Sequence, residues 1–452
     1  MIAIQPRAYQ RKAIDKVVKY LDTDQPDVVV VSPPGSGKTV MIADLAKRAL
    51  GWEWPVVILA HTWEILNQNF DTLVRLGVPK SDIGMMVAKG RLVDRIRPDA
   101  PIQIVSKPTA MRRKDLPEAT LVIIDETQHA PAEGYSKLLQ RWSDAAWVGF
   151  TATPIRLDGK GLDDIFIHMI IAAFPSELIR AGHIARPRLF FNGKLPDLSN
   201  LKVVAGDFAL GELQKRVDKP SLTGNIVKHY LRLTPGIRTI AFAVGIEHAK
   251  NGAAAFRRAS ISSEHIDGKM SVGTREAVLE RFRSGQTQVL WSVGVLAEGY
   301  DLPSIGAIIL ARPTMSLALY LQQTGRVMRK YGRRRPILLD HAGHCQRFAL
   351  AEADRKWTLA GNGANLLLER RPRVCGHCGF GNDPDAKQCD HCDHKLERAQ
   401  SAPRDMPAVR AGHLMPYTEK DMAKVVARIR KIAKEKGWDA DWADAMVRLW
   451  AA

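Results

Sequence analysis

An eight-residue stretch near the N-terminus, Ser32-Pro33-Pro34-Gly35-Ser36-Gly37-Lys38-Thr39, constrains the fold more than any other part of the chain. It follows the apolar, β-branched run 28–31 and precedes a helical pattern over 40–50. Glycines at such a point let successive backbone N–H groups face an anion, and the start of the helix adds the positive end of its dipole. A strand, a glycine-rich loop and a helix in this order predict a loop that binds the phosphates of a nucleoside triphosphate.

Two side chains of this loop carry the predicted chemistry. Lys38 supplies positive charge for the β- and γ-phosphates, and Thr39 supplies a hydroxyl for Mg²⁺. The eight-residue pattern begins with glycine, whereas this chain has Ser32, so the match is read from Gly35 onward. The alternative, a glycine-rich turn before an ordinary core helix, is the weaker interpretation in this context. The residues predicted to surround the phosphates are Pro34, Gly35, Ser36, Gly37, Lys38 and Thr39.

The charge of the chain narrows the class of its partner. Among 452 residues, 66 are Lys or Arg and 48 are Asp or Glu, which gives a formal net charge of +18 at pH 7. Such a surplus favours a polyanion, most simply nucleic acid, over a generically basic protein. No apolar stretch is long enough to span a bilayer, and the N-terminus lacks the apolar core of a signal peptide. We therefore expect a cytoplasmic protein with no membrane partner.

Short β-branched runs alternate with helical patterns along two parts of the chain, which predicts an α/β fold with mostly parallel sheets covered on both faces. The first part has expected strands at 28–31, 56–60, 102–105, 121–124 and 147–150, and the second at 239–244, 289–293, 307–311 and 337–339. Only the first part carries a glycine-rich phosphate loop. The expected divisions are a first domain over 1–185, a connector over 186–224 with a short strand at 188–192, a second domain over 225–345, a helical and basic linker over 346–373, a cysteine-rich module over 374–396, a linker over 397–417 and a helical tail over 418–452.

Two adjacent carboxylates end the apolar run 121–124. In an ATPase with a phosphate loop, this is where Mg²⁺ is held, with Asp125 beside the metal and Glu126 polarising the attacking water. Neighbouring side chains leave a strand on opposite faces, so the two acids can serve different roles. A strand that simply ends in solvated acids is the alternative.

Two arginines lie three residues apart in the segment 322–329, QQTGRVMR, on a predicted helix and therefore on one face. Phosphoryl transfer requires positive charge at the γ-phosphate, and the planar guanidinium group suits that geometry. A basic helix that faces solvent is the alternative.

Seven segments together resemble the superfamily 2 helicases and translocases, in the order and spacing of that family over about residues 5–342. They are Arg7/Tyr9/Gln10, SPPGSGKT (32–39), LAHTWEI (59–65), DETQ (125–128), TATP (151–154), AEGYDLP (297–303) and QQTGRVMR (322–329). The resemblance implies two tandem RecA-like domains with ATP and Mg²⁺ in the cleft between them.

The same resemblance implies roles for further residues. Arg326 and Arg329 would be arginine fingers that reach across the cleft, with Gln322 on the same surface. Gln10, together with Arg7, would read adenine; Thr151 and Thr153 would couple hydrolysis to domain movement; Gly299 and Asp301 would lie near the nucleotide and the bound strand. Relatives in this branch mostly have His where this chain has Gln128, which leaves open how ATP is coupled to the TATP segment.

Four of the five cysteines form the pattern Cys375-x₂-Cys378 and Cys389-x₂-Cys392, with ten residues between the pairs. Two such pairs can supply four thiolates to one Zn²⁺ in a module too small for its own core. Disulfides are the less favoured alternative in the cytoplasm. A helicase core followed by this cysteine segment resembles the bacterial RadD-type DNA repair ATPases, and this resemblance implies a cytoplasmic protein of bacterial or phage type.

The leading hypothesis is an ATP-dependent DNA helicase or translocase in DNA repair, recombination or replication, acting on single-stranded or forked DNA in preference to RNA. The alternatives are the motor subunit of a restriction or defence complex, an RNA helicase, and a nucleic-acid-binding scaffold without ATPase activity. A protein partner could bind through the zinc ribbon or the C-terminal helices.

Overall fold

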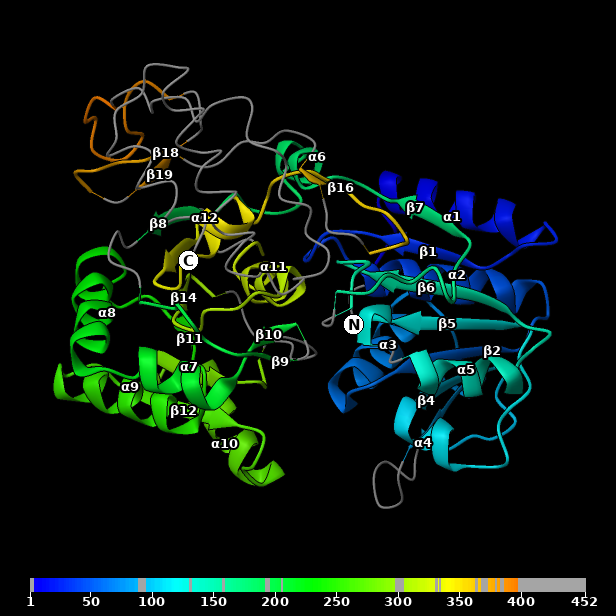
Figure 1. Cartoon of the computed structure of the whole chain (residues 1–452). Helices are drawn as coiled ribbons and strands as arrows, with labels where there is room; N and C mark the ends of the chain where they lie inside the picture. Colours follow the sequence, from blue (N-terminus) through cyan, green and yellow to red (C-terminus); the bar gives the residue numbers. More distant parts are fainter. Residues whose placement is uncertain are drawn as a thin grey trace, which may run out of the picture.

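The computed structural model describes residues 4–87, 95–129, 132–156, 159–191, 196–204, 206–296, 305–329, 332, 335–361, 365–366, 373–378, 380–382 and 386–396. Figure 1 shows two α/β units side by side, the first with α1 and α2 and the second with α8 and α9. The predicted linker at 397–417 and the helical tail at 418–452 lie outside the described residues. Within the described part, no helix has both the length and the apolar character needed to cross a membrane.

In the described part of the first unit, seven strands form a parallel sheet in the order β3-β4-β2-β5-β6-β1-β7. The strands are β1 (Val28–Val31), β2 (Val56–Ala60), β3 (Ile83–Met86), β4 (Ile102–Ser106), β5 (Leu121–Asp125), β6 (Ala146–Thr151) and β7 (His168–Ile171). The accompanying helices are α1 (Ala8–Leu21), α2 (Lys38–Gly51), α3 (Trp63–Arg75), α4 (Lys107–Arg112), α5 (Ala132–Arg141) and α6 (Pro175–Arg180), with 3₁₀ turns η1 (Lys80–Asp82) and η3 (Thr127–His129).

Alternate residues of a strand enter two different cores, as expected for a sheet with helices on both faces. Val28 and Val30 of β1 pack with α1, α2 and α3, whereas Val29 packs with the cluster that contains Leu138 and Trp142 of the α5 region. Because both faces of the sheet are buried, the sequences of these strands are continuous apolar runs.

The second unit repeats this architecture. Its described strands form a parallel sheet in the order β12-β13-β11-β14-β15-β8. The strands are β8 (Arg188–Phe191), β11 (Thr239–Phe242), β12 (Ser263–Asp267), β13 (Val289–Val293), β14 (Ala307–Leu310) and β15 (Ile337–Asp340). The helices are α7 (Leu210–Val217), α8 (Pro220–Leu233), α9 (Ile246–Arg258), α10 (Val272–Ser284), α11 (Leu317–Gly325) and α12 (His344–Phe348). Short antiparallel pairs are β9 (Val203–Val204) with β10 (Asp207–Phe208), β16 (Arg355–Lys356) with β17 (Asn365–Leu366), and β18 (Arg373–Val374) with β19 (Gly381–Asn382).

The parallel α/β architecture predicted from the alternating runs is confirmed. The strand expected in the connector is β8, which forms the edge of the second sheet beside β15 rather than standing alone. Strands β3, β7 and β12 were not expected, because they are short or interrupted by polar residues and glycine. Helix α8 begins at Pro220, inside the expected connector, since proline fits the first turn of a helix.

The expected helical linker over 346–373 is different in the structure. Helix α12 ends at Phe348, and the chain then crosses back to the first unit, where Leu162 donates its N–H to the Leu359 carbonyl at 2.7 Å. Ser176 donates its N–H and its hydroxyl to the Asp354 carboxylate at 3.0 and 2.6 Å. Figure 1 shows β16 beside α6, between the two units. We call residues 350–361 the strap, because they tie the two units together.

Candidate nucleotide site and cysteine cluster

The glycine-rich loop connects β1 to α2, as the sequence predicts. Gly35 and Gly37 have φ angles of 80° and 82°, a left-handed conformation that glycine adopts without strain. Helix α2 begins at Lys38 with Gly37 as its N-cap, so its free N–H groups face the loop. This is the geometry in which a loop and a helix start together form an anion site.

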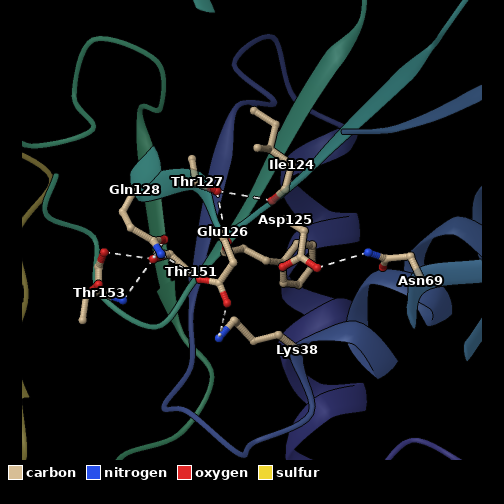
Figure 2. Close-up of polar contacts among 10 residues, drawn as sticks. Lys38, Asn69, Ile124, Asp125, Glu126, Thr127, Gln128, Thr151 and Thr153 are labelled. Carbon is tan, nitrogen blue, oxygen red and sulfur yellow. Dashed lines mark hydrogen bonds and ion pairs between the residues drawn. The ribbon is translucent and has the colours of Figure 1, made fainter. Parts of the chain in front are cut away.

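Lys38 contacts one of the two predicted acids. Its Nζ lies 3.3 Å from Glu126 Oε1, and both side chains are largely buried. Glu126 follows β5 with a φ of 53°, which is strained for a residue with a Cβ. Strain of this kind is retained at functional sites when the surrounding structure enforces it. Figure 2 shows Lys38 and Glu126 pointing toward each other at the end of the sheet.

Gln128 connects this acid to the TATP segment. Its Nε2 donates to Glu126 Oε2 at 2.8 Å, and its Oε1 lies 2.5 Å from the Thr151 hydroxyl oxygen. Thr151 in turn accepts the backbone N–H of Thr153 at 3.0 Å (Figure 2). A glutamine amide has both a donor and an acceptor, so Gln128 can bridge a carboxylate and a hydroxyl. Gln128, which stands where the family pattern has His, therefore contacts both the acid Glu126 and the TATP residue Thr151.

Asp125 is the more buried of the two acids, with 5% of its surface exposed. Burial, together with the negative charge of Glu126, raises its pKa to about 6. Asn69 of α3 donates Nδ2–H to Asp125 Oδ2 at 3.2 Å. The sequence reasoning missed Asn69, although a polar residue on the apolar face of α3, next to Phe70, is a signal that could have identified it.

Side chains from α1 hold the loop from the other side. Gln10 Nε2 donates to the Ser36 carbonyl at 2.8 Å and lies 3.3 Å from the Gly37 carbonyl. The hydroxyl of Tyr9 also donates to the Ser36 carbonyl. Gln10 Oε1 accepts the N–H of Arg7 at 2.7 Å, and the Arg7 side chain is exposed. Gln10 thus contacts the phosphate loop directly, and its predicted role with Arg7 in reading adenine remains a prediction.

The second unit meets the loop at the end of α11. A Cβ atom on Gly325 would lie 2.2 Å from Pro34 Cβ, so only glycine fits there, and Arg329 Cγ would lie 3.7 Å from a Cβ on Gly35. Ala185 donates its N–H to the Met328 carbonyl at 2.7 Å. The segment with the two predicted arginine fingers is therefore packed against the phosphate loop.

Helix α11 ends at Gly325, so the prediction that both arginines lie on one helix is wrong. Arg326 is the C-cap, and a turn follows in which Val327 donates its N–H to the Thr324 carbonyl at 3.0 Å. Arg326 and Arg329 lie in this turn rather than on a helix face, and the Arg329 side chain lies next to Gly35. Arg326 and Gln322 are each 8% exposed. Gly299 and Asp301 lie outside the described residues.

The four clustered cysteines converge. All four Sγ atoms lie within 4.8 Å of one another, with 3.7 Å between Cys375 and Cys392 and 3.6 Å between Cys378 and Cys389. Four sulfur ligands about 2.3 Å from a zinc ion would be separated by about 3.8 Å in a tetrahedron. None of the four forms a disulfide. The donor set and its spacing fit Zn²⁺. The fifth cysteine, Cys345, is buried in the core of the second unit.

Comparison with known proteins identifies the class. Residues 3–156 match the family described as "Type III restriction enzyme, res subunit", and residues 223–331 match "Helicase conserved C-terminal domain". The "51.5 kDa protein" of a Lactococcus phage is 28% identical over 91% of this chain and 86% of its own length. The "Putative ATP-dependent helicase IRC3" of Saccharomyces cerevisiae is 27% identical over 72% of this chain and 49% of its own length.

Among solved structures, "The fragment structure of a putative HsdR subunit of a type I restriction enzyme from Vibrio vulnificus YJ016" has a TM-score of 0.60. It is 21% identical over 77% of this chain and 66% of that one, which shows a shared fold. Each of the two α/β units thus matches a helicase-type family model, and these matches together with the helicase-named relatives support an ATP-hydrolysing helicase of the superfamily 2 type. The finer resemblance to the RadD-type ATPases remains a prediction.

Proposed function

We propose that the chain is an ATP-dependent DNA helicase or translocase that steps along single-stranded or forked DNA in DNA repair, recombination or replication. The observation that carries this proposal is the contact between Gly325 and Pro34, which brings the turn with Arg326 and Arg329 against the loop that contains Lys38. Because the two halves of the site lie on different units, hydrolysis would require their closure, and closure is the movement that drives stepping.

In this proposal each side chain has a defined task. The loop 34–39 would hold the triphosphate, with Lys38 on the β- and γ-phosphates and Thr39 and Asp125 holding Mg²⁺, which would supply charge neutralisation. Glu126 would orient the attacking water, and Arg326 and Arg329 would stabilise the developing charge. Lys38 and Glu126 pair with each other in the structure, so nucleotide binding would separate them.

The link through Gln128 supports a route from the nucleotide to the TATP segment. When Glu126 turns from Lys38 toward water, its contact with Gln128 changes, and Gln128 transmits this change to Thr151. A hydrogen-bonded chain of this kind is strong in a buried site, since nearby water cannot compete.

DNA is proposed over RNA because the segments DETQ and TATP differ from the pattern of the RNA-specific DEAD-box proteins. The net charge of +18 fits either polymer. The match to a restriction-enzyme subunit over residues 3–156 favours a second candidate, the motor subunit of a restriction or defence complex, in which a partner would cut the DNA.

ATP turnover measured with no polymer, single-stranded DNA, duplex DNA, forked DNA and RNA tests the proposal. We expect the strongest stimulation with single-stranded or forked DNA. Equal stimulation by RNA would remove the DNA assignment, and an absence of turnover in every condition would remove the motor. Stimulation by duplex DNA alone would favour the restriction-type motor.

We also propose that Cys375, Cys378, Cys389 and Cys392 bind one structural Zn²⁺. Metal analysis of the freshly purified protein should find one zinc per chain, and the Cys389→Ser variant should lose it. Zinc well below one per chain in the unaltered protein would contradict the assignment. Because structural zinc contributes folding free energy, a chelator should unfold the ribbon before the two α/β units.

A further inference from the structure

The cysteine module, here called the ribbon (373–396), is fixed to the second unit. Phe380 pairs with Phe190 of β8 through an antiparallel bridge, and their rings lie 5.3 Å apart. Cys375, Phe380 and Leu396 join the hydrophobic core that contains Ile309 and Leu339 of the second sheet. Figure 1 shows β19 beside β8, at the edge of that sheet. The ribbon therefore moves with the second unit.

A cavity of about 240 Å³ lies where the ribbon meets this unit. One side is lined by Arg188, Phe190 and Arg232, and the ribbon contributes His377, Cys378 and His391. This cavity is distinct from the nucleotide site, because none of its lining residues belongs to the phosphate loop or to the segment 322–329.

The two arginines give the cavity positive charge. Arg188 is held in place: its Nη2 contacts His391 Nδ1, and its guanidinium lies 5.4 and 5.7 Å from the rings of Phe190 and Phe380. Arg232 lies exposed in the last turn of α8. Among the residues that the structure describes, neither arginine pairs with a carboxylate within 4.0 Å.

Further positive charge lies next to Arg188. Burial and the charges of Arg186 and Arg188 lower the pKa of Arg335. The guanidinium groups of Arg186 and Arg188 are therefore close enough to Arg335 to repel it. Arg186 is balanced by Glu352 at 3.3 Å. Glu352 and Asp390 partly offset the charge around Arg335. Arginines gathered at a concave surface are typical of phosphate recognition, because the guanidinium fork binds phosphate oxygens in pairs.

We propose that this cavity binds a phosphate group of a nucleic-acid backbone, with Arg188 and Arg232 as the contacting residues. The inference rests on the proposed function, in which nucleic acid is the substrate. A phosphate bound here would move together with the second unit. The second unit would thereby contact the nucleic-acid strand at a point outside the cleft between the two units. The contact would be independent of base sequence, since it involves no base edge.

The test compares Arg232→Gln and Arg188→Gln/Arg232→Gln with the unaltered protein in equilibrium binding of single-stranded and duplex DNA at several salt concentrations. Each lost phosphate contact should weaken binding several-fold for every sequence and reduce the slope of log affinity against log salt by about 0.7 to 0.9. ATP turnover without DNA should be unchanged, because neither residue lies at the nucleotide site. Inorganic phosphate serves as the competitor that separates free phosphate from backbone phosphate.

Three controls keep the result interpretable. Arg258→Gln removes an exposed arginine from α9 of the same unit and should leave the salt slope unchanged. Zinc content reports whether the ribbon remains folded in the Arg188 variants, and Arg188→Lys should keep part of the affinity because it keeps the charge.

Unchanged affinity and slope in the double variant, in a protein that does bind DNA, would overturn this site alone. An unaltered protein that binds neither DNA nor RNA would overturn the proposed function together with it. Binding of millimolar inorganic phosphate that is lost in the double variant, with no competition against DNA and no loss of DNA affinity, would identify a free-phosphate site and overturn the backbone assignment.

Discussion

The two sheets have the same parallel architecture but differ at the carboxyl ends of their strands. In the first sheet, β1 leads into a loop with two left-handed glycines, and β5 ends at Asp125, which the strained Glu126 follows. In the second sheet, β11 leads to α9 through Gly245, whose φ of −152° is ordinary extended backbone. The first sheet can surround a phosphate with N–H groups, whereas the second has no such loop among its described residues.

In the second sheet, the polar residue at the end of β15 forms hydrogen bonds within the protein. Asp340, the last residue of β15, accepts the N–H groups of Ala342 and Cys345 at 3.0 and 2.8 Å and is fully buried. Its carboxylate therefore closes a turn instead of facing a ligand. The comparison teaches that the fold positions the strand ends, while the residues at those ends decide whether a site forms. The second unit contacts the glycine-rich loop through Gly325 and the turn after α11.

The sharpest test of this asymmetry is Lys38→Ala. We expect ATP turnover to fall to background, because Lys38 carries the only charge that the loop 32–39 offers to the phosphates. The matched variant is Lys250→Ala, in the helix that follows β11 of the second unit, where Lys250 makes an exposed pair with Glu247 at 2.9 Å. Turnover in that variant should remain normal. Activity that survives Lys38→Ala would show that the site is misplaced.

Arg326→Ala tests the contribution of the second unit. Removal of an arginine finger typically lowers kcat by about 10³-fold or more, and we expect this loss with nucleotide affinity largely retained. Because Arg326 is 8% exposed, its loss could also disturb packing. Arg326→Lys, which keeps the charge without the fork, separates the two effects, since it should fold normally and still lose most of kcat. A kcat within tenfold of the original in both variants would refute the finger role.

Gly325→Ala tests whether the two units must meet closely. The added Cβ would lie 2.2 Å from Pro34 Cβ, so the units should be held apart. A displacement of about 1 Å can cost about 10²-fold in rate, and we expect a loss of about 10- to 100-fold in kcat with nucleotide binding preserved. Gly273→Ala in α10 is the control, because nothing lies within 4 Å of its added Cβ. Equal kcat in the two variants would argue against closure at this contact.

Low pH should lower the stability of the second unit because two of its histidines, His341 and His344, are buried. Burial lowers the pKa of His341 to about 3 and that of His344 to about 4, from 6.5. Both are neutral in the folded chain, and below pH 6.5 they become protonated when the chain unfolds. The free energy of unfolding is therefore highest above pH 6.5 and falls as the pH drops toward 4. For His344 the loss between pH 7 and pH 5 should be about 2 kcal/mol.

Denaturation of the chain at pH 7 and pH 5 measures this slope, with His344→Phe as the comparison. His344 already packs against the rings of Tyr320 and Phe348, so an aromatic ring suits the position. Asp340 and Arg347 oppose each other in their effects on His344 and remain in the variant. An unchanged pH slope in His344→Phe would show that this histidine does not titrate on unfolding.

Much of the fold could be predicted from the sequence, because buried parallel strands are continuous apolar runs. The strands at 28–31 and 56–60 have the predicted bounds, and β8 was found as a strand but not as part of the second sheet. Its partner β15 is more than 140 residues away along the chain, and local pattern carries no information on such pairing. The strap was missed for the same reason, since its hydrogen bonds to Leu162 and Ser176 join distant segments.

The sequence by itself determined which side chains are available for the proposed chemistry: Lys38 and Thr39 in one glycine-rich loop, the adjacent acids Asp125 and Glu126, and the four clustered cysteines. Residue type and close spacing along the chain carry this information. Only the tertiary structure decided which of these residues meet. It placed the turn after Gly325 on Pro34, linked Gln128 to Glu126 and Thr151, and gathered Arg188 and Arg232 beside the ribbon. Contacts between distant segments depend on how the two sheets and their helices pack, which no local stretch of sequence encodes.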